Sequence, residues 1–154
     1  MRDYETLDIA VKAALTGHLA LSTLHTASEA ITRMLDMGIE PFLISSSVIG
    51  VGAQRLVRKV HERCRKKYST SEGVFYRGKS CPNCENSGYK GRIGIMEFLL
   101  LTPKIKELIA NKGLEEEIRK EAIKSEILPL REEGLKKARE GITTLEEVIR
   151  VAGE

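Results

Sequence analysis

The sequence has no long hydrophobic run, no export signal and almost no net charge. Its longest weakly polar stretch, residues 41–53, is too short to span a bilayer and contains three serines and two glycines. The N-terminus lacks the basic region, apolar core and cleavage site of a secretory signal, so we expect the chain to stay in the cytoplasm. With 25 basic and 22 acidic residues, the net charge of +3 is too small to indicate nucleic acid or an anionic membrane as a partner.

Cysteine is also scarce, and the positions of the three cysteines indicate a metal site. A disulfide is unfavourable in a reducing compartment, and three thiols would leave one unpaired. His61 and Cys64 are separated by two residues, and so are Cys81 and Cys84, with sixteen residues between the pairs. This spacing is typical of zinc, because two tight turns can direct four N and S donors at one tetrahedral ion. A site with four protein ligands has no open position, so we expect structural zinc; free thiols beside a surface histidine are the alternative.

The apolar pattern in the first third of the chain predicts alternating helices and strands. Residues 3–15 fit a helix with a wide buried stripe that ends at Gly17. Residues 19–24 are typical of a short strand that is buried on both faces of a parallel sheet. Further helices are predicted at 29–37 and over the weakly polar stretch 41–53. This order is typical of an α/β fold.

The rest of the chain reads as a polar insert followed by a strand and helices. Residues 54–61 fit either a helix or a strand, and 64–92 are predicted to be a loop-rich insert without a packed layer. Residues 92–101 predict a strand, and the remaining segments predict helices with solvated outer faces. Thr144 and Glu147 have the spacing of a capping box.

Four stretches together resemble a known family: residues 2–26, 31–58, 81–101 and 130–154. They are similar, in the same order, to the C-terminal half of the ATPases that drive type II secretion and type IV pilus assembly. The resemblance implies an α/β fold with a partial RecA-like parallel-sheet core, a small zinc-binding insert and an all-helical C-terminal tail. It assigns residues 1–60 to the RecA-like core and 61–92 to the zinc-binding insert. Residues 93–154 are assigned to a final strand and the C-terminal helical subdomain.

The resemblance also implies a function for the complete protein. Members form homo-hexamers that use ATP and Mg²⁺ to move an inner-membrane platform protein, so we expect a location at the cytoplasmic face of the bacterial inner membrane. No GxxxxGK[ST] loop occurs in these residues, so the cradle for the β and γ phosphates is absent from this chain. We therefore expect the chain alone to be inactive. The alternative is a non-catalytic, zinc-stabilised module for subunit or platform contacts.

Two histidines fall in the stretch that resembles the family's histidine box, residues 17–26. His25 lies at the carboxyl end of the predicted strand, where α/β sheets present ligands, and is the candidate for contacts to phosphate or water. His18 lies at the other end, roughly 20 Å away in an extended strand, and we expect a structural or subunit-contact role. A satisfied core or edge histidine is the alternative for each.

Three arginines are further candidates for the nucleotide site or a subunit interface, because a guanidinium can bridge two phosphate or carboxylate oxygens. They are Arg2, Arg33 and Arg55. For each of them a surface salt bridge is the alternative.

Overall fold

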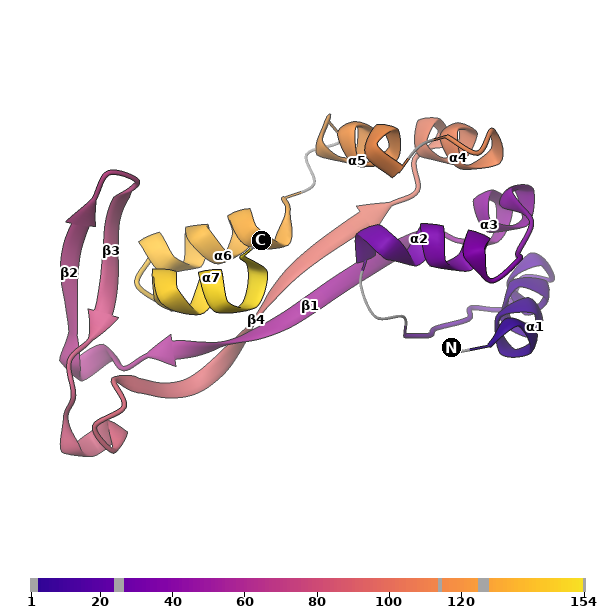
Figure 1. The fold of residues 1–154 in the computed structure, drawn as a ribbon. Helices are drawn as coiled ribbons and strands as arrows, with labels where there is room; N and C mark the ends of the chain where they lie inside the picture. Colours follow the sequence, from indigo (N-terminus) through magenta and orange to yellow (C-terminus); the bar gives the residue numbers. More distant parts are fainter. Residues whose placement is uncertain (1–2, 24–26, 114, 125–127, 154) are drawn as a thin grey trace. The chain divides into compact units, whose positions relative to one another are not determined.

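The structure, a computed structural model, describes residues 3–23, 27–113, 115–124 and 128–153. The chain divides into two compact units (Figure 1). Unit 1 comprises Met1–Ala53 and Glu97–Ile127, and unit 2 comprises Gln54–Met96 and Leu128–Glu154. Two long strands, β1 (Gly50–Val60) and β4 (Tyr89–Leu100), contribute residues to both units. The proposed division at residues 60 and 92 stays a prediction.

Unit 1 is mainly helical, with local sequence signals at the helix ends. The Asp3 carboxylate caps the first helix by accepting from the Thr6 amide at 2.8 Å, and Pro41 occupies the first turn of the third. Gly17 ends the first helix with φ of +92°, a conformation that favours glycine. The helices are α1 (Tyr4–Leu15), α2 (Ala27–Asp36), α3 (Pro41–Ser47), α4 (Pro103–Ala110) and α5 (Glu115–Lys124).

The core of unit 1 is formed by the inward faces of these helices and the adjoining strand residues. The predicted helices at 3–15 and 29–37 are confirmed, since each places its apolar stripe in this core. The buried members are Leu7, Val11, Ile31, Met34, Ile39, Ile44, Leu99, Leu101, Ile105, Ile109, Ile118 and Ala122.

The predicted buried strand at 19–24 is wrong over the residues that the structure describes. Residues 18–23 form no strand, and the side chains of Leu19 and Leu21 are 77% and 87% exposed. A strand needs a neighbour to satisfy its backbone groups, and no described strand pairs with this segment. The described sheets are two separate strand pairs, so the predicted parallel sheet is not found within this part of the chain.

The predicted helix over 41–53 is correct only for its first half. Helix α3 ends at Ser47, and β1 begins at Gly50. Two glycines and three β-branched residues in 48–52 lower the helix propensity there. A Cβ on Gly50 would lie 2.8 Å from the Phe98 ring, so a larger residue would displace this ring.

Unit 2 is built on strands and two helices. In Figure 1 the paired strands β1 and β4 run in opposite directions. Residues 54–61, which the sequence leaves undecided, are mostly β1, and the strand predicted at 92–101 is confirmed as β4. Strands β2 (Arg65–Thr70) and β3 (Gly73–Gly78) form an antiparallel hairpin, and two short 3₁₀ turns, η1 (Glu62–Cys64) and η2 (Pro82–Cys84), flank it.

The insert at 64–92 is therefore not a loop-rich segment without a packed layer, as predicted, but contains a hairpin that packs on the helices of unit 2. Helices α6 (Leu130–Arg139) and α7 (Leu145–Ala152) confirm the helical tail. The fully buried Phe75 of β3 joins their core with Leu135, Ala138 and Val148. One fully buried side chain in two six-residue strands gives too little periodicity to predict this packing.

None of the helices that the structure describes is long and apolar enough to cross a membrane.

Candidate metal centre

The four predicted metal ligands lie at two turns with the same construction. His61 precedes η1, and the Cys64 amide donates to the His61 carbonyl at 3.1 Å. Cys81 precedes η2, and the Cys84 amide donates to the Cys81 carbonyl, also at 3.1 Å. Each two-residue gap therefore forms one tight turn with both ligand side chains directed to the same point, as the sequence predicts.

The distances between the ligand atoms fit a tetrahedral ion. All four atoms lie within 4.8 Å of one another. His61 Nδ1 is 3.4 Å from Cys64 Sγ and 3.3 Å from Cys81 Sγ, and Cys84 Sγ is 3.9 Å and 3.5 Å from the same two sulfurs. Zinc bonds of about 2.3 Å to sulfur and 2.0 Å to nitrogen place tetrahedral ligands roughly 3.5–3.8 Å apart. The arrangement is therefore a group that could hold a metal.

Backbone groups around Gly88 connect the two turns. The Gly88 amide donates to Cys84 Sγ at 3.3 Å, and the Gly88 carbonyl accepts from the His61 amide at 2.9 Å. Gly78, at the end of β3, passes so close that a Cβ on it would lie 2.1 Å from the Gly88 carbonyl oxygen. Glycine at 78 is therefore required by close backbone approach.

The thiols have different proton affinities when they share this site without a metal charge. Burial, with hydrogen bonds to Cys81 and Cys84, raises the pKa of Cys64 to about 11. Burial also raises the pKa of Cys84, but backbone hydrogen bonds with Cys81 and Gly88 outweigh it and lower the pKa to about 7. A bound cation would favour the thiolate at all three sulfurs, including Cys64, whose pKa is raised without it.

The predicted histidine pair is only partly described. His25 lies outside the described residues. His18 is exposed, and its Nδ1 lies 3.2 Å from the Thr16 hydroxyl oxygen, just after α1. The roles assigned to both histidines stay predictions.

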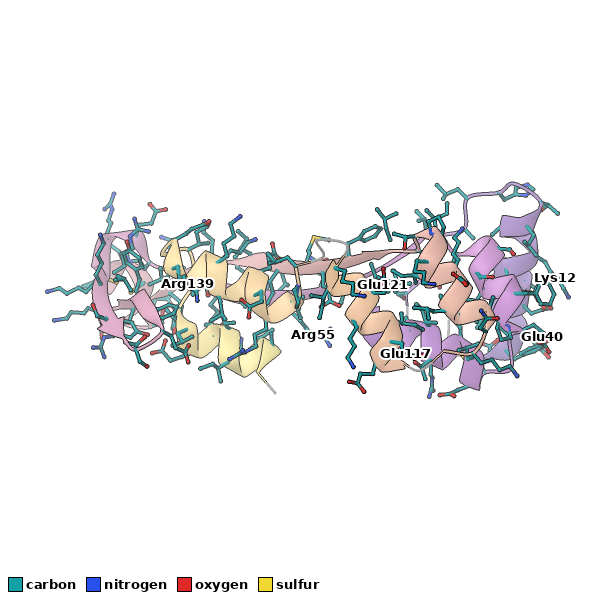
Figure 2. All side chains as sticks on the ribbon, turned by 90° about the horizontal axis from the view of Figure 1, so that it is seen from above. Lys12, Glu40, Arg55, Glu117, Glu121 and Arg139 are labelled. Carbon is teal, nitrogen blue, oxygen red and sulfur yellow. The ribbon has the colours of Figure 1, made fainter. Side chains whose placement is uncertain are left out.

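The three candidate arginines are not brought into one site by any described contact. Arg2 lies outside the described residues, and Arg33 is exposed in the last turn of α2. Arg55, on β1 (Figure 2), donates to the carbonyl of its neighbour Gln54 at 3.3 Å. Their proposed charge contacts stay predictions.

Unit 2 contains a buried carboxylate that the sequence pattern does not predict. The capping box predicted at Thr144 is half confirmed, because the Thr144 hydroxyl accepts from the Glu147 amide at 3.2 Å. Glu147 is only 1% exposed, and its carboxylate accepts from the Arg58 amide at 2.9 Å and from the Arg58 guanidinium at 2.6 Å. Arg150 donates two further bonds, at 2.9 and 2.8 Å. The prediction that this helix has only a solvated outer face is therefore wrong at Glu147.

The two arginines explain the acidity of the buried group. Hydrogen bonds from Arg150 and Arg58 lower the pKa of Glu147 to about 2, although burial of the carboxylate acts in the opposite direction. Arg58 also stacks 4.1 Å above the Tyr89 ring, whose hydroxyl oxygen lies 3.0 Å from that of Thr144. The i,i+3 spacing of Glu147 and Arg150 is visible in the sequence, whereas Arg58 is 89 residues away and could not be found.

The fold defines the class of protein to which the chain is similar. It superposes on the structure of the pilus retraction motor PilT with bound ADP, with a TM-score of 0.68 and 25% identity over 97% of this chain and 37% of that one. The ATPase DotB of Legionella pneumophila gives a TM-score of 0.64 at 19% identity, over 96% of this chain and 35% of that one, which shows the fold alone. The chain thus has the α/β fold of part of a secretion ATPase.

Sequence comparison identifies the family. A family model described as "Type II/IV secretion system protein" matches residues 1–150, and the chain belongs to this family. It is 47% identical to type II secretion system ATPase E of Vibrio cholerae over 100% of this chain and 33% of that protein. It is 45% identical to the type IV pilus assembly ATPase PilB of Thermus thermophilus, over 97% of this chain and 19% of that protein. The chain therefore spans a third or less of the length of these relatives.

Proposed function

We propose that this chain is the C-terminal part of a hexameric ATPase that powers type II protein secretion or type IV pilus assembly. The match over residues 1–150 to the family carries this proposal. ADP in the PilT structure supports nucleotide binding by the complete protein, and phosphoryl transfer of this kind uses Mg²⁺. The phosphate-binding loop would be supplied by a part of the protein outside these 154 residues.

In the complete protein we propose that residues 1–60 belong to a RecA-like core, 61–92 to the metal-binding insert and 93–154 to a helical subdomain. Residues 19–24 would then pair with strands supplied from outside the chain, which would cover Leu19 and Leu21. The platform protein of the secretion or pilus machine would be the partner, at the cytoplasmic face of the inner membrane. The exposure of the two leucines supports this pairing, because it leaves apolar surface in water.

Within the nucleotide site we assign His25 to phosphate oxygens or water, and His18 to a structural or subunit contact. Arg2, Arg33 and Arg55 are assigned to phosphate or interface charge. The exposure of His18, Arg33 and the end of α2 supports such contacts, because these groups are accessible to a second subunit.

We further propose that His61, Cys64, Cys81 and Cys84 bind one Zn²⁺. The ligand spacing and the three sulfurs fit this ion, which would supply structural cross-linking of the two turns. The His61 imidazole would bind through Nδ1, the ring nitrogen that faces the sulfurs. The Gly88 amide would hold the Cys84 sulfur from the backbone side.

Hydrolysis by the full-length protein tests the motor proposal. We expect His25→Ala to slow ATP turnover more than His18→Ala, because the first removes a group proposed to face the phosphate. The matched pair changes one imidazole each, within eight residues of chain. Equal or reversed effects would refute the assignment of His25. A full-length protein that binds its platform partner without any turnover would instead favour the non-catalytic interaction module.

A further inference from the structure

Unit 2 has a strongly positive segment that the net charge of the whole chain conceals. Between Gln54 and Met96 there are eleven lysines and arginines but only three acidic residues. Five of these cations lie on the β2–β3 hairpin and the residue after it, positions 65–79, which we call the basic hairpin. They are Arg65, Lys66, Lys67, Arg77 and Lys79, and all of them are exposed.

The cations of the basic hairpin have no carboxylate partner within the part of the chain that the structure describes. Seven ion pairs occur there, and none involves the basic hairpin. Its single acidic residue, Glu72, lies at the tip between the strands. Seven cations elsewhere, from Lys12 to Arg150, are paired, but other exposed cations such as Lys90 are in no ion pair either. What sets the basic hairpin apart is that five such cations are grouped on one element.

The strand register places like charges opposite each other. Lys66 pairs directly with Arg77 across the two strands, an arrangement that destabilises a strand pair. Lys79 follows the last residue of β3, and its amide donates to the Cys64 carbonyl at 2.8 Å, which continues the pairing by one residue and puts Lys79 on the same side as Arg77. The Arg77 guanidinium lies 4.8 Å from the centre of the Tyr68 ring, which limits its freedom to turn away. The hairpin thus holds three cations together at a cost to its own stability.

We propose that the basic hairpin is a docking surface for an acidic protein segment, with Lys66 and Arg77 pairing with two of its carboxylates. Residues directly opposite in an antiparallel pair have Cβ atoms about 4.5–5.5 Å apart. Residues at i and i+4 on a helix likewise have Cβ atoms about 5–6 Å apart. An acidic helix therefore offers two carboxylates at the spacing of this cation pair, and the charges are complementary.

Two observations favour a protein over other polyanions. Single-stranded nucleic acid is bound through stacking on open aromatic faces. Here cations lie over both hairpin tyrosines, Arg77 over Tyr68, and Arg65 and Lys67 over Tyr76. Membrane-surface elements combine cations with apolar side chains that enter the bilayer. Val74 is the one large apolar side chain exposed between residues 61 and 92, a range that the structure describes throughout.

Binding of two synthetic peptides to the metal-loaded chain tests the proposal. Both are alanine-based helices with the same number of glutamates, placed at i,i+4 in one and on opposite helix faces in the other. We expect the i,i+4 peptide to bind about tenfold more tightly in fluorescence anisotropy, and more weakly as salt is raised. Lys66→Gln and Arg77→Gln should each weaken it by about tenfold. The control Lys90→Gln, which removes the same charge outside the hairpin, should change binding by less than about twofold.

The variants also separate docking from general stability. Because Lys66→Gln relieves the repulsion with Arg77, it should raise the thermal midpoint by about 1–3 °C while it weakens binding. A lower midpoint would overturn the inference that the pair is held at a cost. Equal weakening by Lys90→Gln, or no difference between the peptides, would overturn the proposed docking surface. The proposed docking surface would also be overturned if phosphatidylglycerol vesicles or a single-stranded oligonucleotide bound through Lys66 and Arg77 more tightly than the i,i+4 peptide. ATP turnover is not needed for this test, so its outcome is independent of the proposed motor function.

Discussion

The buried carboxylate of Glu147 provides the sharpest test of how unit 2 is held together. We predict that Glu147→Gln destabilises unit 2 and removes an acid-dependent part of its stability. Each carboxylate oxygen accepts two of the four bonds from Arg58 and Arg150, and the amide nitrogen of glutamine cannot accept a hydrogen bond, so two of the four are lost. The substitution keeps the size of the side chain, so it leaves no cavity.

The magnitude follows from the lowered pKa of Glu147. A change from the ordinary value of 4.5 to about 2, at 1.36 kcal/mol per unit, corresponds to about 3 kcal/mol at neutral pH. Arg58 and Arg150 are 49% and 56% exposed, and solvent screening of these partners reduces the expected loss to about 2 kcal/mol. Because the ionised form is favoured in the folded state, this contribution is complete above pH 4.5 and is lost as the pH falls toward 2.

Hydrogen exchange of residues 143–152 measures this loss locally, at neutral pH and through the acid range. After correction for the intrinsic exchange rate, the wild type should lose protection as the pH falls below 4.5. The Glu147→Gln variant, which is less protected at neutral pH, should lose little further protection over the same range. The matched control is Glu132→Gln on the exposed side of α6, which should change stability by less than about 0.5 kcal/mol. An equal, pH-independent effect of the two variants would refute the importance of the Arg58–Glu147–Arg150 cluster.

Other predictions concern the metal centre and the packing around it. Removal of metal with a chelator should increase hydrogen exchange over residues 61–92 while leaving α6 and α7 protected, and unchanged exchange in 61–92 would contradict metal-dependent folding. Gly78→Ala should weaken metal binding by about tenfold, because its Cβ would meet the Gly88 carbonyl, whereas the exposed control Ser80→Ala should not. Phe75→Ala should cost about 3 kcal/mol of unit 2 stability in urea denaturation, and Val74→Ala, at a half-exposed neighbour, less than about 1 kcal/mol.

Local signals in the sequence predict the helices and the ligand turns well. A capping aspartate, a proline at a helix start and a glycine with positive φ each act over a few residues, so α1 and α3 begin where expected. The two-residue gaps at His61–Cys64 and Cys81–Cys84 are equally local, because one turn defines both side-chain directions.

Long-range pairing is what the sequence does not reveal. The apolar residues at 19–24 predict a buried strand, but burial depends on strand neighbours, and no strand of the described structure pairs with residues 18–23. Strands β2 and β3 bury only one side chain fully, Phe75, and the residues that it meets on α6 and α7 are distant in the sequence, so no local pattern encodes this packing. Arg58 and Glu147 meet across 89 positions, and the capping-box spacing of Thr144 and Glu147 gives no sign of this contact.

The zinc content of the purified chain is the most direct test of the proposed metal centre, measured by native mass spectrometry beside His61→Ala and His61→Cys. We expect one zinc per wild-type chain, retention of the ion in His61→Cys, and reduced occupancy in His61→Ala, because Nδ1 is the nitrogen that faces the sulfurs. A wild-type chain that folds fully without metal, or equal occupancy in wild type and His61→Ala, would contradict it.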